Sequence, residues 1–341
     1  MASLRCGRRP ATRQTGARLT VGRPVGWTRA AACASRRAMS RPTVADAPGV
    51  MRTEGWADYA LLDSGGGRKL ERYGPYTVVR PEPQCLWTPR KPELWDQADA
   101  VFDPTDEEDA GRWRFSGQPK EAWPLAWREV RFLGRFTAFR HLAFFPEQAA
   151  NWAFLDERVR AHAGSAGSDG PPRVLNLFGY TGVASLVMAA AGAAVTHVDA
   201  SKKAVAWARE NAEASKLSDR PIRWIVEDAR RYVQREVRRG SKYDGIILDP
   251  PKYGRGPDGQ VWRLFEDLPE LAGLCAELLS ENASFLILNA YAERISGAAL
   301  SGLLAEKLAG RGGRIDWGEL ALVEDGGDRQ VGMSFYGRWS R

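Results

Sequence analysis

The sequence is poor in the residues that build metal sites and disulfide frameworks. It contains four cysteines and three histidines in 341 residues, and these form neither a CxxC pair nor an HExxH motif. We therefore predict no structural metal site and no disulfide-stapled fold. The sequence also lacks any apolar run long enough for a membrane-spanning helix, so we expect no membrane association.

Acidic residues are absent from the first 45 positions, although ten arginines lie there. An arginine-rich and serine-containing segment without Asp or Glu is typical of organelle transit peptides. We predict a disordered transit peptide over residues 1–45 that directs the protein to the mitochondrion, with the plastid as the alternative. A disordered basic arm that binds RNA is the competing interpretation of the same segment.

The net charge of +7 depends on this basic segment. Without its ten arginines, the rest of the chain has 39 basic and 42 acidic residues. The isoelectric point of 9.3 therefore gives no argument for nucleic-acid binding by the folded part. Over the whole chain the composition is typical of a globular protein, with 44% apolar and 27% charged residues.

Residues 46–145 are predicted to form a small domain rich in β-strands and tryptophan. Three strand-like runs lie between residues 59 and 87 and are separated by turns at Gly66-Gly67 and Gly74-Pro75. The tryptophans of this region either form the domain core or provide a stacking platform for RNA bases. Five of them are Trp87, Trp95, Trp113, Trp123 and Trp127.

Residues 146–341 are predicted to form a second, α/β domain. Strand and helix patterns alternate from residue 173 onward, and the last two strand patterns are joined by a turn at residues 325–328. Such an order is typical of a doubly wound sheet. We predict a Rossmann-like, mostly parallel, seven-stranded sheet with an antiparallel C-terminal hairpin.

The first strand of this domain enters a glycine turn, and the second strand ends on a carboxylate, Asp199. This geometry predicts a nucleotide-type pocket at the strand ends. A nicotinamide site needs G-x-G-x-x-G, but Leu177 occupies the position of the first glycine. A P-loop needs a Lys followed by Ser or Thr after its last glycine, whereas Val183 follows Gly182. Neither class fits.

S-adenosylmethionine fits better, because it carries no phosphate and needs close backbone approach together with carboxylates. We expect Asp199 to bind the ribose diol, and Asp228 to accept from the adenine amino group while Ala229 offers its backbone. Asp249 follows the fourth strand, beside the expected methyl group. Each carboxylate taken alone could simply cap the next helix, but three in register favour a ligand site.

Residues 145–296 resemble class I S-adenosylmethionine-dependent methyltransferases through NLFGYTG, VDASKKAVAWARENAEAS, EDA and YDGIILDPPKY. They are most similar to the bacterial 23S rRNA large-subunit methyltransferases that act on cytosine C5 or guanine N7. The resemblance implies RNA as the partner. It also implies cofactor contacts from Asn176, Phe178, Gly179, Thr181, Gly182, Asp199, Ala200, Ser201, Asp228 and Ala229, and acceptor contacts from Asp249, Pro250, Pro251, Lys252 and Tyr253.

One departure from these relatives concerns the acceptor atom. Cytosine C5 methylation needs a thiolate that adds to the ring, and in relatives with this chemistry a cysteine follows the sixth motif strand. Here that strand continues into Asn289, Ala290 and Tyr291. The DPP motif with its aromatic residue instead suits attack by a base nitrogen, with Tyr253 stacking on a flipped base.

The sequence thus predicts a methyltransferase that acts on a nucleobase of organellar RNA, with ribosomal RNA as the expected substrate. A methyltransferase for a protein or a small molecule is the second hypothesis, because the chain without its basic segment is not basic. An RNA-binding ribosome-assembly factor with a vestigial cofactor pocket is the third.

Overall fold

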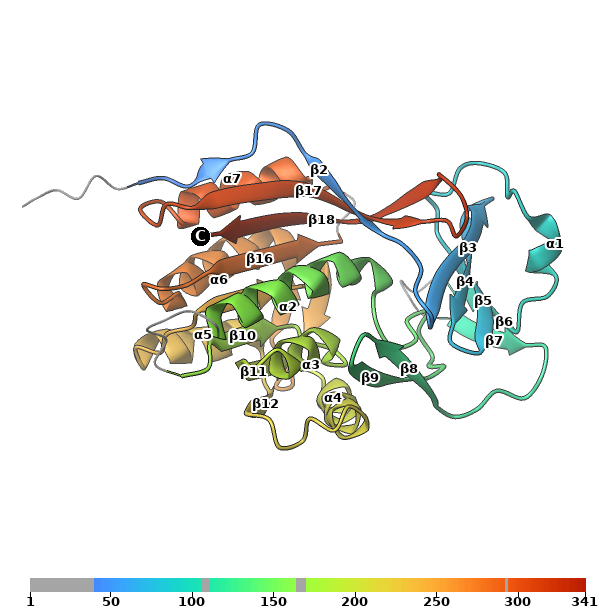
Figure 1. The fold of residues 1–341 in the computed structure, drawn as a ribbon, viewed down its shortest axis with the longest axis horizontal. Helices are drawn as coiled ribbons and strands as arrows, with labels where there is room; N and C mark the ends of the chain where they lie inside the picture. Colours follow the sequence, from blue (N-terminus) through green and yellow to red (C-terminus); the bar gives the residue numbers. More distant parts are fainter. Residues whose placement is uncertain (1–39, 106–110, 164–169, 292–293) are drawn as a thin grey trace, which may run out of the picture. The chain divides into compact units, whose positions relative to one another are not determined.

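The computed structural model describes residues 40–105, 111–163, 170–291 and 294–341 (Figure 1). Most of the predicted transit peptide, residues 1–39, lies outside the described residues. The last residues of the predicted transit peptide, 40–45, include β1 (Thr43–Val44), which pairs with β17 (Arg314–Val323). The large sheet thus includes two residues that lie before the predicted boundary at residue 45, and that boundary stays a prediction.

A nine-stranded sheet forms the larger part of the fold. Five parallel strands make its centre and one edge: β10 (Arg173–Leu177), β11 (Ala194–Asp199), β12 (Ile222–Val226), β13 (Gly245–Leu248) and β16 (Phe285–Ala290). β18 (Gln330–Ser340) runs antiparallel to both β16 and β17, and the order is β1-β17-β18-β16-β13-β10-β11-β12. The predicted parallel sheet with its antiparallel hairpin is confirmed.

The sheet has two strands more than predicted, and both come from the N-terminal side. β2 (Gly49–Thr53) pairs in parallel with β17, next to the place where β1 pairs with the same strand. Residues 43–53 therefore cover the edge of the large sheet instead of belonging to the β-rich domain. The sequence signal was weak because these strands are short and mostly exposed.

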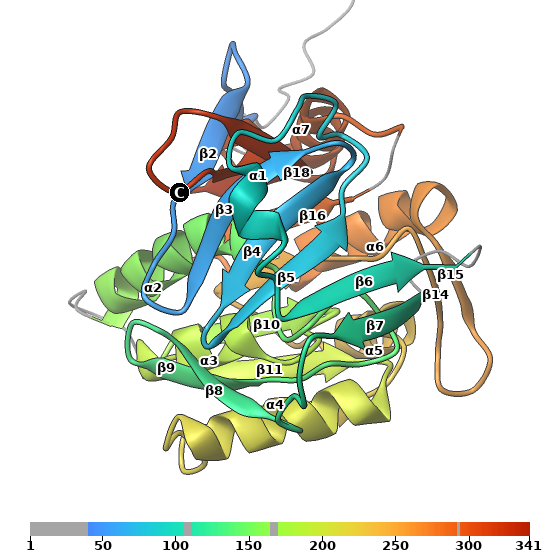
Figure 2. The same cartoon turned by 90° about the vertical axis from the view of Figure 1, so that its right-hand side faces the viewer.

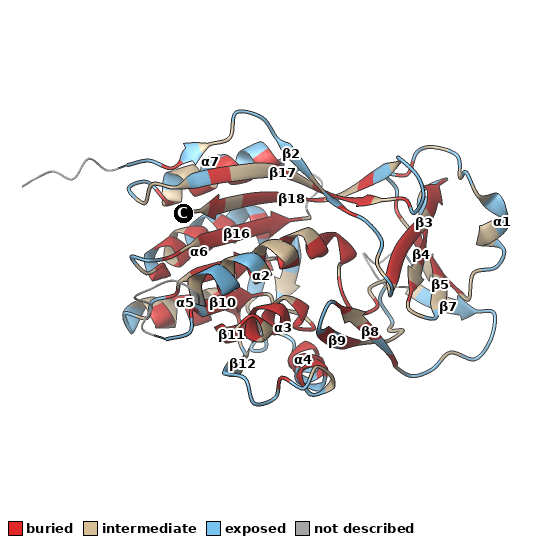
Figure 3. Cartoon of the chain, viewed as in Figure 1, coloured by how far each residue is buried: buried red, intermediate tan, exposed pale blue. Residues whose placement is uncertain are grey.

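Helices cover both faces of the sheet (Figures 1 and 3). On one face, Val174 packs with side chains of α2 (Ala149–Ala163) and α3 (Val183–Ala190), and α4 (Lys202–Ala214) lies beside α3. On the other face, Leu175 packs with α5 (Ala229–Arg238), α6 (Leu264–Leu278) and α7 (Gly297–Lys307). Successive strand residues point to opposite faces, and both are buried, which explains the continuous apolar runs.

A separate five-stranded sheet follows β2 and precedes β10 in the chain (Figure 2). It contains β3 (Tyr59–Gly65), β4 (Arg68–Tyr73), β5 (Tyr76–Pro81), β6 (Ala100–Pro104) and β7 (Gly111–Phe115), with the short α1 (Pro92–Trp95) between β5 and β6. A hairpin of β8 (Trp123–Trp127) and β9 (Val130–Gly134) follows and contacts α3 and α4.

The tryptophans of this region serve its core. Trp123 and Trp127 are buried. The ring nitrogens of the half-buried Trp87, Trp95 and Trp113 donate to Ser64, to Asp63 and to the Phe139 carbonyl, respectively. These bonds fix the rings within the domain, so the structure favours the core interpretation over a stacking platform.

Among the described residues, no helix is long and apolar enough to cross a membrane.

Candidate methyl-donor and acceptor site

The carboxyl ends of the parallel strands bring the three predicted carboxylates to one cavity of about 320 Å³, the donor cavity. Asp199 ends β11, Asp228 follows β12 and Asp249 follows β13. Parallel strands end at the same edge of a sheet, and ligands bind there in open α/β folds. The cavity walls comprise Phe145, Phe178, Tyr180, Asp199, Ala200, Ser201, Asp228, Ala229, Asp249, Pro250, Pro251, Gly254, Arg255, Gly256, Trp262 and Tyr291.

Asp199 organises the glycine turn as well as the cavity. Its Oδ2 accepts from the backbone N–H of Tyr180 at 2.8 Å, and its Oδ1 accepts from that of Ser201 at 2.8 Å. Burial raises the pKa of this carboxyl, while the two backbone donors act in the opposite direction. Each oxygen has a second lone pair, so a carboxylate held in this way can still accept from a ligand's hydroxyl groups.

The turn itself has a strained backbone. Phe178 and Tyr180 have φ values of 58° and 48°, in the left-handed region that side chains other than glycine rarely adopt. Gly179 lies between them, and a Cβ there would be 2.4 Å from a ring carbon of His197. The fold therefore needs glycine at this position for close packing. Strained turns of this kind occur at ligand sites.

Asp228 caps a helix and also lines the donor cavity. Its Oδ1 accepts from the backbone N–H of Arg231 at 2.9 Å and so caps α5. The residue also lines the cavity together with Ala229. Helix capping and ligand contact are thus compatible here, because the capping bond uses one oxygen.

Asp249 is half-buried, lines the donor cavity and lies beside Gln148 of the helical turn η1 (Pro146–Gln148). The side-chain nitrogen of Gln148 lies 3.4 Å from Asp249 Oδ2 and donates to the hydroxyl of Tyr291 at 2.7 Å. Burial, reinforced by the nearby carboxyl of Glu147, raises the pKa of Asp249 to about 8. A carboxyl with such a pKa can take up or release a proton near neutral pH.

The remaining predicted cofactor residues lie deeper. Asn176, Gly179 and Thr181 line a small cavity of about 50 Å³ next to the donor cavity, not the donor cavity itself. Asn176 donates to the Ser185 hydroxyl, and the Thr181 hydroxyl donates to the Ala143 carbonyl. A Cβ on Gly182 would lie 2.8 Å from Ala208 Cβ, so this glycine permits α4 to pack closely.

Of the predicted acceptor residues, Pro250 and Pro251 line the donor cavity. Tyr253 lines neither the donor cavity nor the larger cavity described below; it is 49% exposed at the start of the hairpin of β14 (Tyr253–Arg255) and β15 (Val261–Arg263). Lys252 lines the larger cavity.

Sequence reasoning missed the aromatic walls of the site. The ring of Phe145 contacts those of Tyr180 and Tyr291, with centroids 5.7 and 5.6 Å apart, respectively. Trp262 contacts Phe178 at 5.0 Å. These residues come from four separate segments, which only the tertiary fold assembles. The one local signal was that Tyr291 directly follows the β16 strand end, where site residues are expected.

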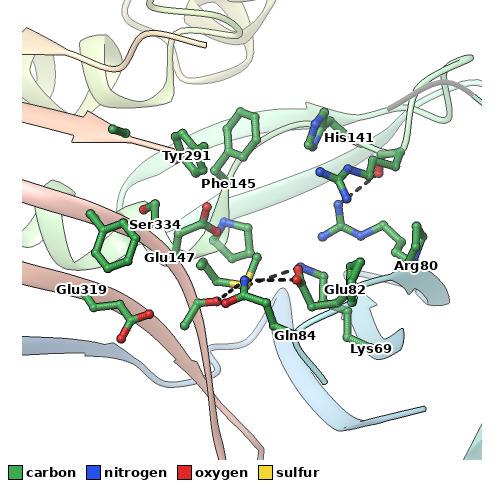
Figure 4. Close-up of a pocket in the computed structure, with 18 of the residues that line it drawn as sticks. Lys69, Arg80, Glu82, Gln84, His141, Phe145, Glu147, Tyr291, Glu319 and Ser334 are labelled. Atoms are coloured by element: carbon green, nitrogen blue, oxygen red, sulfur yellow. Dashed lines mark hydrogen bonds and ion pairs between the residues drawn. The ribbon is translucent and has the colours of Figure 1, made fainter. Parts of the chain in front are cut away.

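A second, larger cavity of about 570 Å³ adjoins the donor cavity and shares Phe145 and Tyr291 with it (Figure 4). Side chains of the β3–β7 sheet, of η1 and of the β17–β18 hairpin surround it. Its lining comprises Lys69, Arg80, Pro81, Glu82, Pro83, Gln84, Arg140, His141, Phe144, Phe145, Pro146, Glu147, Lys252, Ala290, Tyr291, Glu319, Gly332, Met333, Ser334 and Phe335.

A buried ion pair supports the N-terminal wall of this cavity. Arg80 donates to both carboxylate oxygens of Glu71 at 2.8 and 2.9 Å, and Tyr59 donates to the same carboxylate at 2.9 Å. Arg80 also donates to the Arg140 carbonyl at 3.0 Å. Bidentate, fully bonded pairs of this kind fix side chains in one geometry.

The two cysteines in the described part of the chain line neither cavity. Cys85 and Cys275 are buried, and burial raises the pKa of both thiols, that of Cys85 to about 12. Neither therefore provides a thiolate for addition to a pyrimidine ring. Among the described residues, no cluster of three or more His, Cys, Asp or Glu could hold a metal ion.

The fold and the strand-end cavity define a class I methyltransferase. Carboxylates for hydroxyl and amino groups, together with aromatic walls, suit a charged nucleoside such as S-adenosylmethionine. The chain is 49% identical to a SAM-dependent methyltransferase from Agrobacterium tumefaciens, over 88% of this chain and 96% of that one, with a TM-score of 0.83. The protein belongs to the S-adenosylmethionine-dependent methyltransferase family.

Other relatives match parts of the chain. Residues 165–269 match the family described as conserved hypothetical protein 95. Ribosomal RNA large subunit methyltransferase K/L of Shewanella sp. (strain ANA-3) is 34% identical over 40% of this chain and 19% of its own length. Ribosomal RNA large subunit methyltransferase I of Aeromonas hydrophila is 28% identical over 53% of this chain and 45% of its own length. The chain thus spans about a fifth and less than half of these two relatives.

These findings confirm the predicted enzyme class and its cofactor. They also favour an enzyme over the assembly factor with a vestigial pocket, because the three strand-end carboxylates are present and meet at one cavity.

Proposed function

We propose that the protein methylates a nucleobase of ribosomal RNA with S-adenosylmethionine as the donor. The observation that carries the proposal is the pair of adjoining cavities, which share Phe145 and Tyr291. Such an arrangement suits a donor and an acceptor that must meet at one point. The similarity to two ribosomal RNA large subunit methyltransferases supports RNA as the acceptor.

In this proposal, the strand-end residues hold the donor, which supplies an activated methyl group on a positively charged sulfur. Asp199 accepts from the ribose hydroxyls, and Asp228 accepts from the adenine amino group. Phe178 and Trp262 provide apolar walls on the same cavity. Holding both reactants in one place contributes much of the rate in such transfers.

Asp249 has the chemistry of a proton acceptor for the attacking group. An amino nitrogen that gains a methyl group must lose a proton, and the Asp249 carboxylate can take it. Gln148 fixes this carboxyl through its side-chain nitrogen at 3.4 Å. Nitrogen attack needs no thiolate, in agreement with the positions of Cys85 and Cys275.

Transfer of labelled methyl groups tests this function. The purified protein is incubated with methyl-tritiated S-adenosylmethionine and, in parallel, with unmodified large-subunit rRNA transcribed in vitro, with a protein extract and with a small-molecule extract. The proposal expects label in RNA at one nucleotide and none with Asp249→Asn. Label only in protein or in small molecules would support the second hypothesis instead.

We also propose that residues 1–45 direct the protein to the mitochondrion, with the plastid as the alternative. The ten arginines and the absence of acidic residues in this segment support the proposal. Fusion of residues 1–45 to a fluorescent protein tests it. Import into either organelle, lost when five of the arginines are replaced by glutamine, is the expected result, and a diffuse signal contradicts the proposal.

A further inference from the structure

The most unusual group in the 570 Å³ cavity is the carboxyl of Glu147. The residue is 1% exposed, and its Oε1 has no hydrogen-bond partner among the described residues. A buried oxygen without a partner costs free energy, so an unexplained one points to a missing ligand. Burial raises the pKa of this carboxyl, as expected for a group that lacks compensating bonds.

Glu147 lies on η1, between Phe145 and Gln148. Phe145 lines both cavities, and Gln148 bonds to Asp249 and Tyr291 on the donor side. Four consecutive residues, 145–148, therefore present an aromatic ring, a buried carboxyl and the contact to Asp249. Figure 4 shows Glu147 below the rings of Phe145 and Tyr291, with Ser334 beside it.

The surrounding rings suit a flat acceptor. His141, Phe145 and Tyr291 form a row, with ring centroids 4.7 and 5.6 Å apart. Flipped-out bases commonly stack on aromatic side chains, while polar groups bond to their edges. Lys69, buried with its Nζ 3.5 Å from Glu82 Oε2, adds a positive charge on the N-terminal side of the same cavity.

We propose that Glu147 recognises the acceptor, a flipped-out nucleobase that donates an N–H group to Glu147 Oε1 while it stacks against Phe145. This inference rests on the proposed RNA methylation and names the residue that reads the base edge. Selection acts through the unpaired oxygen, because a base without an N–H at that edge leaves it unsatisfied and so binds more weakly.

For Glu147→Gln and Glu147→Ala we expect higher thermal stability together with lower methyl transfer to RNA. Both remove a buried and incompletely bonded carboxyl, so both raise the unfolding temperature. Neither changes the affinity for S-adenosylmethionine in calorimetry, because Glu147 does not line the donor cavity. Methyl transfer to unmodified large-subunit rRNA falls about tenfold to a hundredfold in kcat/KM for Glu147→Ala, and less for Glu147→Gln, which keeps an acceptor oxygen.

Asp63→Asn is the matched control. Asp63 is equally buried, but its carboxylate accepts from three backbone N–H groups and from Trp95, and it lines neither cavity. This variant loses thermal stability and keeps its kcat/KM for RNA.

Three results would overturn the proposal. Unchanged kcat/KM for RNA in both Glu147 variants would show that Glu147 does not recognise the acceptor, while the proposed RNA methylation would stand. Loss of stability together with activity assigns a structural role to Glu147. Absence of RNA methylation by the wild-type protein overturns the RNA function and this inference together.

Discussion

The side-chain nitrogen of Gln148 lies 3.4 Å from Oδ2 of Asp249, although 101 positions separate the two residues in the sequence. The same nitrogen donates to the Tyr291 hydroxyl at 2.7 Å. Gln148 thus connects a turn that borders the 570 Å³ cavity to the carboxyl that borders the donor cavity. The Asp249 carboxyl is fixed at their junction, and its elevated pKa has measurable consequences.

The first consequence is a pH dependence of the rate. If Asp249 accepts a proton from the acceptor, only its ionised form is active. Because burial raises its pKa to about 8, we expect kcat/KM for RNA to rise about tenfold per pH unit below pH 8 and to level off above it. A pH–rate profile between pH 6 and 9.5 measures this. A profile that is flat over the whole range would exclude Asp249 as the base.

The second consequence concerns stability. The folded pKa of Asp249 lies above the unfolded value of 3.8, so the folded state keeps a proton that the unfolded state loses. The penalty is absent below pH 3.8 and grows by about 1.4 kcal/mol per pH unit as the pH rises toward 8. Asp249→Asn should therefore be much more stable than the wild type at pH 8, and more stable by only about 1 kcal/mol at pH 4.5. Urea unfolding at both pH values checks the difference.

His197 is expected to act in the opposite direction. It is fully buried, its Nδ1 lies 3.0 Å from the Ser185 hydroxyl, and burial lowers its pKa to about 3. Below pH 6.5 the unfolded state binds a proton that the folded state does not, so stability falls as the pH decreases from 6.5 toward 3. His197→Gln removes this term. Compared with the wild type, it should show a shallower loss of stability between pH 6.5 and 4.5; equal slopes would contradict the assignment.

Gly179 is expected to be irreplaceable for packing reasons. A Cβ at this position would lie 2.4 Å from a ring carbon of His197, so Gly179→Ala should cost about 1–3 kcal/mol of stability. Gly302 in α7 is the control, because a Cβ there meets no atom within 4 Å. Gly302→Ala should raise stability by about 0.5–1 kcal/mol. Equal effects of the two substitutions in chemical unfolding would refute this explanation.

The buried pair of Glu71 and Arg80 should contribute far more than an exposed one. Arg80→Met removes both guanidinium hydrogen bonds from the buried Glu71 carboxylate and leaves only Lys69, at 3.9 Å, as its cation, which should cost about 3–5 kcal/mol. The exposed pair of Arg114 and Asp103 is the comparison, and Arg114→Met should cost much less stability than Arg80→Met. Denaturant midpoints for both variants give the answer; similar costs would show that burial is not decisive.

The sequence predicted the donor side better than the acceptor side, for a physical reason. Asp199, Asp228 and Asp249 each come at the end of a strand, and parallel strands end at one edge, so local pattern was sufficient to bring them together. Glu147 and Tyr291 meet only because η1 lies across the end of β16, which no local pattern records. The same limit explains β1 and β2, whose short exposed runs gain their structure only from pairing with β17.

The resemblance implies a ligand contact for each turn residue, whereas the structure shows other roles for some of them. Asn176 and Thr181 bond to protein groups, and Gly182 makes room for α4. Motif residues that hold a turn in shape and residues that line its cavity cannot be distinguished by spacing alone. Only their side-chain directions separate them.

The most direct test of the central claim is calorimetric titration with S-adenosylmethionine of the wild-type protein and of Asp199→Ala. The wild type should bind one equivalent. The variant loses the carboxylate that accepts from the ribose and fixes the turn through Tyr180 and Ser201, so its affinity should fall at least about tenfold. No binding by the wild type, or equal binding by both proteins, would contradict a methyl-donor site at the ends of these strands.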